Sequence, residues 1–216
     1  TVNRQIIPGL VAHWKLDDGT GTNPAVIAAV DSGPHVPPFD GMLTNMLGTT
    51  EWVAPVSNIK YPNSKALQFF ATSPYDYVLI SNSDNAALKF GNHITLVKAS
   101  FSLSAWINLT SLPNSWRGVI TKSADSGSYW YGIWIGGNVS PRNHWVFGGA
   151  DGGSPRNTIC NMATVGWHHV VAVQNVGANP ERMMYIDGQP ANCTEPGSVT
   201  AALYADGTGE FRIGGG

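Results

Sequence analysis

Two strand-like segments, close together in the chain, constrain the fold more than any other feature. Residues 166–173 (GWHHVVAV) are rich in aromatic and β-branched side chains, and residues 183–189 (MMYIDGQ) contain the turn-forming pair Asp187-Gly188. Glycine supplies the positive φ that a tight turn needs, so this pairing is typical of a β-hairpin. The pattern predicts an all-β protein.

An alternation of period two continues through most of the chain. It is clearest in residues 101–108, where one face carries Phe101, Leu103, Ala105 and Ile107 and the other carries Ser102, Ser104, Trp106 and Asn108. Further strands are predicted at residues 10–16, 65–70, 77–80, 118–122, 129–135, 144–148, 167–174, 182–186 and 209–213. Turns rich in Gly, Pro, Asn and Asp separate them, which predicts a two-sheet antiparallel β-sandwich. Residues 19–62 are Pro-rich and weakly periodic, and are expected to form a long loop.

Composition limits the function classes. The 216 residues suit one β-sandwich domain, since such domains often reach this length. Charged residues make up 12% of the chain, the formal net charge is -2, and lysine and arginine do not cluster. A nucleic acid or an anionic membrane is therefore a poor partner for this chain. A run of 18 apolar residues is also absent from the sequence, so we expect no membrane insertion.

The two cysteines flank the predicted hairpin, Cys160 before its first strand and Cys193 after its second. Antiparallel pairing would bring these positions together, so a disulfide at the base of the hairpin is geometrically reasonable. The alternative is two buried free thiols. A disulfide would indicate an oxidising compartment, and hence a chain that is secreted or held at the cell surface.

Aromatic residues with polar neighbours are the main candidates for ligand binding. Flat aromatic faces stack on sugar rings, while Asn, Asp and Arg hydrogen-bond to hydroxyl groups. The candidate glycan-binding residues are Trp116, Arg117, Trp130, Trp134, His144 and Trp145. Each tryptophan has the alternative role of filling the sandwich core, and Trp116, in a polar loop, is the strongest candidate for a ligand contact.

Catalytic patterns are weaker. Retaining glycoside hydrolysis needs two carboxyl groups about 5 Å apart, and the glutamates of this chain are isolated in sequence. A lyase would need a Tyr or His base beside a neutralising group, and Tyr129, His144 and Arg117 are available for these roles in neighbouring predicted strands.

His168 and His169 point to opposite faces of one strand, so they are not expected to bind one ion together.

These segments resemble a known family. Residues 166–173 and 183–189, together with FSLSAWI at 101–107 and LVAHWKLD at 10–17, are similar to laminin G-like domains of the concanavalin A-like jelly-roll superfamily. The resemblance extends from about residue 9 to 215 and implies one laminin G-like domain over 1–216, alone or as a piece of a larger protein. In the family a histidine follows this tryptophan as part of the fold signature, which implies a structural role for His169.

The resemblance also implies a calcium ion. Asp31-Ser32-Gly33 and Asp40-Gly41 resemble a turn that holds structural calcium in many members, and Asp76 falls where relatives have a similar strand entry. The implied ligands are Asp31, Asp40 and Asp76, because calcium prefers oxygen ligands. The alternative is that the aspartates of this region, Asp17, Asp18, Asp31 and Asp40, form Asx-turns.

Relatives usually continue into one more strand that pairs beside the first. We therefore expect either a fragment or a sheet edge that another protein chain completes. The favoured function is a non-catalytic carbohydrate-binding module, lectin-like and extracellular, whose partner is a polysaccharide or glycan. The alternatives are a protein–protein adhesion or structural subunit of an extracellular assembly and, third, a polysaccharide lyase or hydrolase of the same fold.

Overall fold

The computed structural model describes twelve stretches of the chain: residues 7–19, 28–46, 52–54, 64–70, 74–80, 86–92, 94–123, 129–136, 143–151, 154–194, 198–205 and 209–215. They belong to two compact units. The first comprises residues 1–83 with 212–215, and the second comprises 84–211 with 216. The prediction of a single domain over 1–216 stays a prediction.

The first unit contains short antiparallel strands. Strands β1 (Ala28–Ala29), β2 (Gly41–Thr44) and β5 (Tyr77–Ile80) pair in that order, and β3 (Trp52–Val53) pairs with β4 (Ala66–Leu67). Strand β18 (Glu210–Gly214) begins in the second unit and ends in the first. Within the first unit, the Arg212 guanidinium lies 4.4 Å from the centre of the Tyr77 ring.

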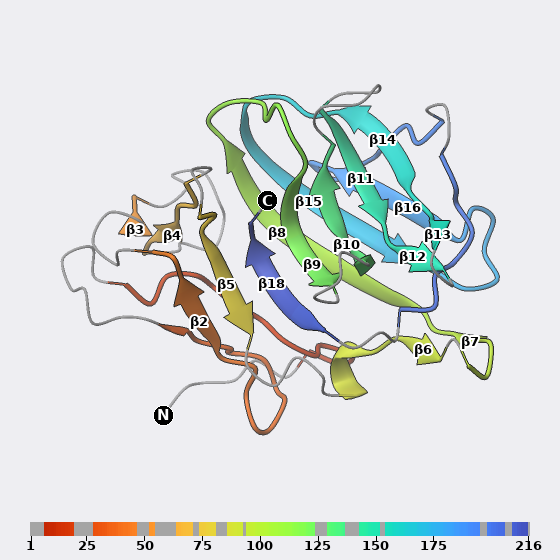
Figure 1. The fold of residues 1–216 in the computed structure, drawn as a ribbon, viewed down its shortest axis with the longest axis horizontal. Helices are drawn as coiled ribbons and strands as arrows, with labels where there is room; N and C mark the ends of the chain where they lie inside the picture. Colours follow the sequence, from red (N-terminus) through yellow and green to blue (C-terminus); the bar gives the residue numbers. More distant parts are fainter. Residues whose placement is uncertain are drawn as a thin grey trace. The chain divides into compact units, whose positions relative to one another are not determined.

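Two antiparallel sheets build the second unit. One has the order β17-β16-β15-β8, and the other contains β9-β10-β11-β14 (Figure 1). The first sheet consists of β8 (Phe101–Leu109), β15 (Gly166–Gln174), β16 (Arg182–Ile186) and β17 (Gln189–Pro190). The second consists of β9 (Arg117–Ser123), β10 (Tyr129–Ile135), β11 (His144–Gly148) and β14 (Thr158–Met162). Three small elements complete the unit: the 3-10 turn η1 (Ala86–Leu88), the hairpin β6 (Gly91–Asn92) with β7 (Val97–Lys98), and the hairpin β12 (Ala150–Asp151) with β13 (Ser154–Pro155).

Aromatic residues from both sheets meet in the core of the second unit. Phe101 of β8 lies 5.2 Å from Tyr131 of β10 and 6.0 Å from Phe147 of β11, measured between ring centres. The Tyr131 hydroxyl donates to the carbonyl oxygen of Leu88 at 2.8 Å, which satisfies its polar end inside the core. Burial of this phenol raises its pKa, because the charged form is poorly solvated there.

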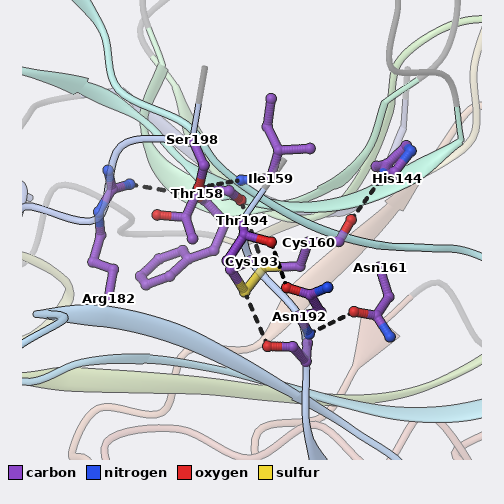
Figure 2. Close-up of a disulfide and its surroundings, with 12 residues drawn as sticks. His144, Thr158, Ile159, Cys160, Asn161, Arg182, Asn192, Cys193, Thr194 and Ser198 are labelled. Atoms are coloured by element: carbon purple, nitrogen blue, oxygen red, sulfur yellow. Dashed lines mark hydrogen bonds between the residues drawn. A yellow bond between two sulfur atoms is a disulfide. The ribbon is translucent and has the colours of Figure 1, made fainter. Parts of the chain in front are cut away.

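The disulfide between Cys160 and Cys193 is present, as the sequence predicted. It joins β14 to the segment that follows β17, so it connects the two sheets of the second unit (Figure 2). The backbone N–H of Asn192 donates to the Asn161 side-chain oxygen beside it. Together these contacts fix the segment after the hairpin to the opposite sheet.

The β-sandwich prediction is confirmed, and most predicted strands are present within a residue or two. The strand predicted at residues 10–16 is wrong: only Trp14 forms a β-bridge there, with Asp31. Leu16 has a φ of 55°, a conformation that ends an extended strand. The predicted long loop at 19–62 contains the short strands β1, β2 and β3, and its residues 20–27, 47–51 and 55–62 lie outside the described residues.

Candidate functional site: an aromatic pair on a sheet face

Trp134 lies on the face of β10 that points away from the core. Tyr131 and Ile133 are fully buried in the core, and Trp134 alternates with them, opposite Val146 of β11. Its ring crosses Gly132, where an added Cβ would lie 2.8 Å from Trp134 Cη2. The ring is therefore packed flat against the backbone and is nearly buried.

Trp116 is the more accessible member of the predicted set on that face. Its ring lies against Gly136, where an added Cβ would be 3.3 Å from Trp116 Cη2, and the side chain is 36% exposed. The Arg117 Nη1 donates to Ser115 Oγ at 2.5 Å and to the Trp116 carbonyl oxygen at 3.0 Å, so this arginine stabilises the loop. Trp130, half-buried, falls on the same face as Trp134 by alternation.

The remaining two predicted residues have structural contacts. Trp145 is 1% exposed and points into the core, where its ring meets His168 edge-on at 6.0 Å between ring centres. His144 is buried, and its Nδ1 donates to the Cys160 carbonyl oxygen at 2.5 Å (Figure 2). The structure thus brings Trp116 and Trp134 to one face and places Trp145 on the other. The six-residue ligand-binding set stays a prediction, with Trp116 as its accessible member.

A different tryptophan is more exposed than any of these. Trp106 of β8 is 52% exposed, and β8 pairs with β15 so that His169 stands directly opposite Trp106. Their rings stack with 5.0 Å between centres and an interplanar angle of 26°. His169 Nε2 lies 2.9 Å from Ser104 Oγ, a hydrogen bond that fixes the imidazole. We call Trp106 and His169 the aromatic pair.

Asp187 anchors the histidine side of this pair. Its Oδ1 accepts a hydrogen bond from the backbone N–H of His169 at 2.8 Å, and its Oδ2 lies 2.8 Å from His168 Nδ1. Burial opposes the charge on Asp187, but the hydrogen bonds from His168 and from the His169 backbone outweigh it and lower the pKa of this carboxyl. The turn at Asp187-Gly188 therefore also fixes the part of β15 that carries His169.

The two adjacent histidines point to opposite faces, as the sequence predicted. His168 points inward, toward Trp145 and Asp187, and its Nε2 lies 3.1 Å from the Thr164 carbonyl oxygen. His169 points outward and joins the aromatic pair. His168 thus makes the inward contacts, and His169, for which the family resemblance implied a structural role, is bonded to Ser104 on the outward face.

The sequence contained a signal for Trp106. Its neighbours at every second position, Ser102, Ser104 and Asn108, are polar, so Trp106 is a large aromatic residue on the solvent face of an amphipathic strand. Burial drives most tryptophans into the core, and one displayed on a polar face is the informative exception. Alternation predicts Trp106 on that face, whereas the tryptophans predicted to bind a glycan lie in loops and apolar strands.

The aspartates assigned to calcium have other contacts. Asp31 is buried, and its carboxylate accepts three backbone N–H groups: from His13 at 2.8 Å and Gly33 at 2.7 Å on Oδ1, and from Phe39 at 3.0 Å on Oδ2. N–H groups direct positive dipoles at these oxygens, which disfavours a cation there. The donors around Asp31 therefore do not fit a calcium ion.

The other two implied ligands also bind backbone. Asp40 Oδ1 accepts from the Asp31 N–H at 2.8 Å, and Asp76 Oδ2 accepts from the Phe70 N–H at 2.9 Å. Across the described residues, His, Cys, Asp and Glu form no group of three or more that could hold a metal ion. Only Asp31, through its bond from the Gly33 N–H, has the geometry of an Asx-turn, while Asp40 and Asp76 bind backbone groups further away in sequence. Calcium stays a prediction.

The second unit is a β-sandwich whose two sheets are linked by a disulfide, and one of its sheets displays the exposed aromatic pair. The family model of the concanavalin A-like lectin/glucanases superfamily, of the laminin G-like type, matches residues 76–216. Because this match covers more than half of the sequence, the chain belongs to that superfamily.

Solved structures similar to the chain include Trypanosoma rangeli sialidase in complex with sialic acid (14% identity, TM-score 0.49, 97% of this chain and 28% of that chain) and the same enzyme with the inhibitor DANA (12% identity, TM-score 0.43, 87% of this chain and 26% of that chain). The chain thus spans little more than a quarter of these proteins, and at this level the similarity carries no information about function. The search of curated proteins found no match.

Proposed function

We propose that this chain is a non-catalytic carbohydrate-binding module, and that the aromatic pair is where a glycan binds. The carrying observation is that Trp106 is half exposed although its ring is held by His169. An exposed indole offers a flat apolar face to the apolar side of a sugar ring. Because the ring is already fixed, little side-chain entropy is lost on binding.

The surroundings of the pair favour a hydroxyl-rich ligand. Ser104 and Asn108 flank Trp106 on the same face of β8, and both are exposed. Their hydroxyl and amide groups donate and accept hydrogen bonds, as a sugar hydroxyl requires. We place the module outside the cell or at the cell surface, because its disulfide persists in an oxidising compartment. None of the described residues lies in a helix long and apolar enough to span a membrane.

Replacement of Trp106 by alanine is expected to weaken glycan binding by about thirtyfold, the effect of losing about 2 kcal/mol from a tryptophan at the centre of a binding site. The measurement is affinity electrophoresis of the wild type and variants through gels that contain individual polysaccharides. Trp106→Phe keeps a flat ring and should retain most of the binding. The melting temperature of Trp106→Ala should stay close to that of the wild type, because this side chain is outside the core.

Trp116→Ala is the matched control on the other sheet. If Trp116→Ala loses binding and Trp106→Ala keeps it, the glycan binds at the predicted Trp116 position and our choice of site is wrong. If the wild type is retained by none of the polysaccharides, the proposed function itself is wrong.

One observation favours a protein partner as the alternative. The hairpin β6–β7 displays Ile94, Leu96 and Val97, which are 80%, 70% and 54% exposed. Asn92 Oδ1 accepts hydrogen bonds from the N–H groups of Ile94 and Thr95, which tie these two residues to the end of β6. Exposed apolar side chains gathered in this way suit a pocket on another protein. In an adhesion or assembly subunit, changes at this tip would abolish association, whereas Trp106→Ala would not.

Two described residues of types that serve in catalysis, Glu181 and His144, are engaged in structural contacts. Glu181 accepts hydrogen bonds from the N–H groups of Ala202 and Gly177, and these bonds lower the pKa of its carboxyl. A general acid in glycoside hydrolysis needs the opposite shift. His144 is buried and hydrogen-bonded to the backbone, and the side chain of Tyr129 lies outside the described residues. These contacts support a binding role over a catalytic one.

The calcium prediction can be tested by thermal unfolding. Because backbone N–H groups already satisfy Asp31, we expect the melting temperature to be the same, within about 1 °C, in excess calcium and in chelator. A structural ion at a hundred times its dissociation constant would instead add about 2.7 kcal/mol, a rise of about 5–10 °C for a chain of this size. A rise of that order, lost in Asp31→Asn, would establish the ion.

A further inference from the structure

The aromatic pair lies in a longer row of exposed side chains. Ser102, Ser104, Trp106 and Asn108 all project from the same face of β8, and all four are exposed. Successive members are about 6.6 Å apart, since a strand rises about 3.3 Å per residue. This spacing is comparable to the length of one sugar unit in a polysaccharide. We call these four residues the β8 row.

The stacking direction decides where a sugar can lie. His169 is directly opposite Trp106 on β15, so the imidazole covers the indole face that is turned toward the centre of the sheet. Strand β8 is the last strand in its sheet (Figure 1). Because His169 covers one indole face, the other face is turned toward the outer edge of the sheet. A sugar that stacks on Trp106 therefore sits beside β8, and a chain attached to it can run along the strand.

The polar members of the row are available for a ligand. Within the part of the chain that the structure describes, the side chains of Ser102 and Asn108 make no hydrogen bond. Ser104 Oγ is bonded to His169 Nε2, yet a hydroxyl with one donor and two acceptor sites can make another bond. Hydrogen-bonding groups thus lie on both sides of the indole, about one sugar unit away in each direction.

The sheet face around the β8 row is formed by uncharged residue types. The outward residues of β8 and of the paired part of β15 include neither Asp, Glu, Lys nor Arg; on β15 they are Trp167, His169, Val171 and Val173. Asp187, in the turn that follows β16, is bonded through its two oxygens to His168 and to the His169 backbone. Recognition of a uronate, sialate or sulfate group would need cationic partners that this face does not supply.

We infer that the ligand is a linear, neutral polysaccharide that lies along β8, with consecutive sugar units at Ser104, Trp106 and Asn108. This inference rests on the proposed function and specifies its ligand class. The site recognises an internal stretch of the polysaccharide rather than its end, because hydrogen-bonding groups lie in both directions along β8 from Trp106. Trp106 contributes most of the affinity, and the polar residues fix the direction and register of the chain.

The test is isothermal titration with neutral oligosaccharides of one to six units, prepared from the polysaccharide that the wild type retains. Affinity is expected to rise at least tenfold from one unit to three and to level off by four or five. Asn108→Ala should weaken binding of the trisaccharide about fivefold, the effect of one hydrogen bond, and leave binding of the single unit unchanged. Asn175→Ala, an exposed asparagine beyond the end of β15, is the matched control and should change neither.

Other outcomes would overturn the inference and leave the proposed function standing. A single sugar unit that binds as tightly as the trisaccharide would show a site for chain ends. Preference for an acidic polymer over its neutral counterpart would contradict the ligand class. Failure of the wild type to bind any glycan would instead overturn the proposed function and this inference together.

Discussion

Replacement of Arg182 by methionine is expected to lower the free energy of unfolding by about 4 kcal/mol, because the buried carbonyl oxygens that it binds lose their donor. Arg182 begins β16 and is fully buried. Its Nε donates to the Ala201 carbonyl oxygen at 2.6 Å, and its Nη1 donates to those of Arg156 at 2.7 Å and Phe147 at 3.2 Å. Its Nη2 donates to the Val199 carbonyl oxygen.

The size of the effect follows from what the guanidinium holds together. Its acceptors lie on β11, on the turn before β14 and on residues 198–205, and Figure 2 shows the side chain directed toward Thr158 and its neighbours. Methionine fills a similar volume but leaves several buried carbonyl oxygens without a donor, at about 1–3 kcal/mol each before relaxation. Lysine would keep the charge but lose the planar fork, so Arg182→Lys should fall between the wild type and Arg182→Met.

Urea unfolding followed by tryptophan fluorescence measures this difference. Arg156→Met is the matched control, because Arg156 is exposed and its side chain lies outside this network, and it should change stability by less than about 0.5 kcal/mol. Equal stability of Arg182→Met and the wild type would show that the buried hydrogen bonds contribute nothing net. If Arg182→Met does not fold, the intermediate stability of Arg182→Lys still tests the argument.

The strands of the second unit could be predicted from sequence because their alternation is local. Residues 101–109 show polar and apolar faces that the structure reproduces residue by residue. Residues 10–16 show a similar pattern, yet their backbone bonds go to Ile7, Asp31 and Ser32, with the His13 N–H donating to Asp31 Oδ1. The carboxylate of Asp31, eighteen residues from His13 in sequence, binds a backbone N–H that a neighbouring strand would otherwise bind. Alternation within residues 10–16 does not indicate this contact.

Contacts over long sequence distances were also beyond prediction. Gln174 is buried at the end of β15, where its side-chain amide donates to the carbonyl oxygens of Ala99 and Leu203 and accepts the Leu203 N–H. The Gln174 side chain thus bonds to backbone groups of two other segments, as a neighbouring strand would. Its neighbours in the sequence do not indicate this role. The aromatic pair is similar: alternation placed Trp106 on the solvent face, but only the register of β8 and β15 shows that His169 fixes its ring.

Removal of the disulfide is expected to lower the free energy of unfolding by about 4 kcal/mol, because Cys160 and Cys193 close a loop with a sequence separation of 33 residues. The loop contains β15, β16 and β17, so the unfolded chain gains most of its extra freedom in the hairpin that carries His169. The double variant Cys160→Ala, Cys193→Ala should therefore unfold at a lower urea concentration and at a lower temperature than the wild type.

The matched control is the wild type itself, unfolded with and without reductant. Reduction breaks the same bond without replacing either cysteine. Reduced wild type and the double variant should lose similar stability, while the double variant should be indifferent to reductant. The hydrogen bond from the Asn192 N–H to Asn161 does not depend on the disulfide, and we expect the reduced protein to stay folded in mild conditions. Glycan binding at the aromatic pair should then persist below the unfolding transition, because Trp106 and His169 are positioned by strand pairing and by Asp187. Loss of binding in a reduced but folded protein would show that the disulfide also sets the geometry of the site.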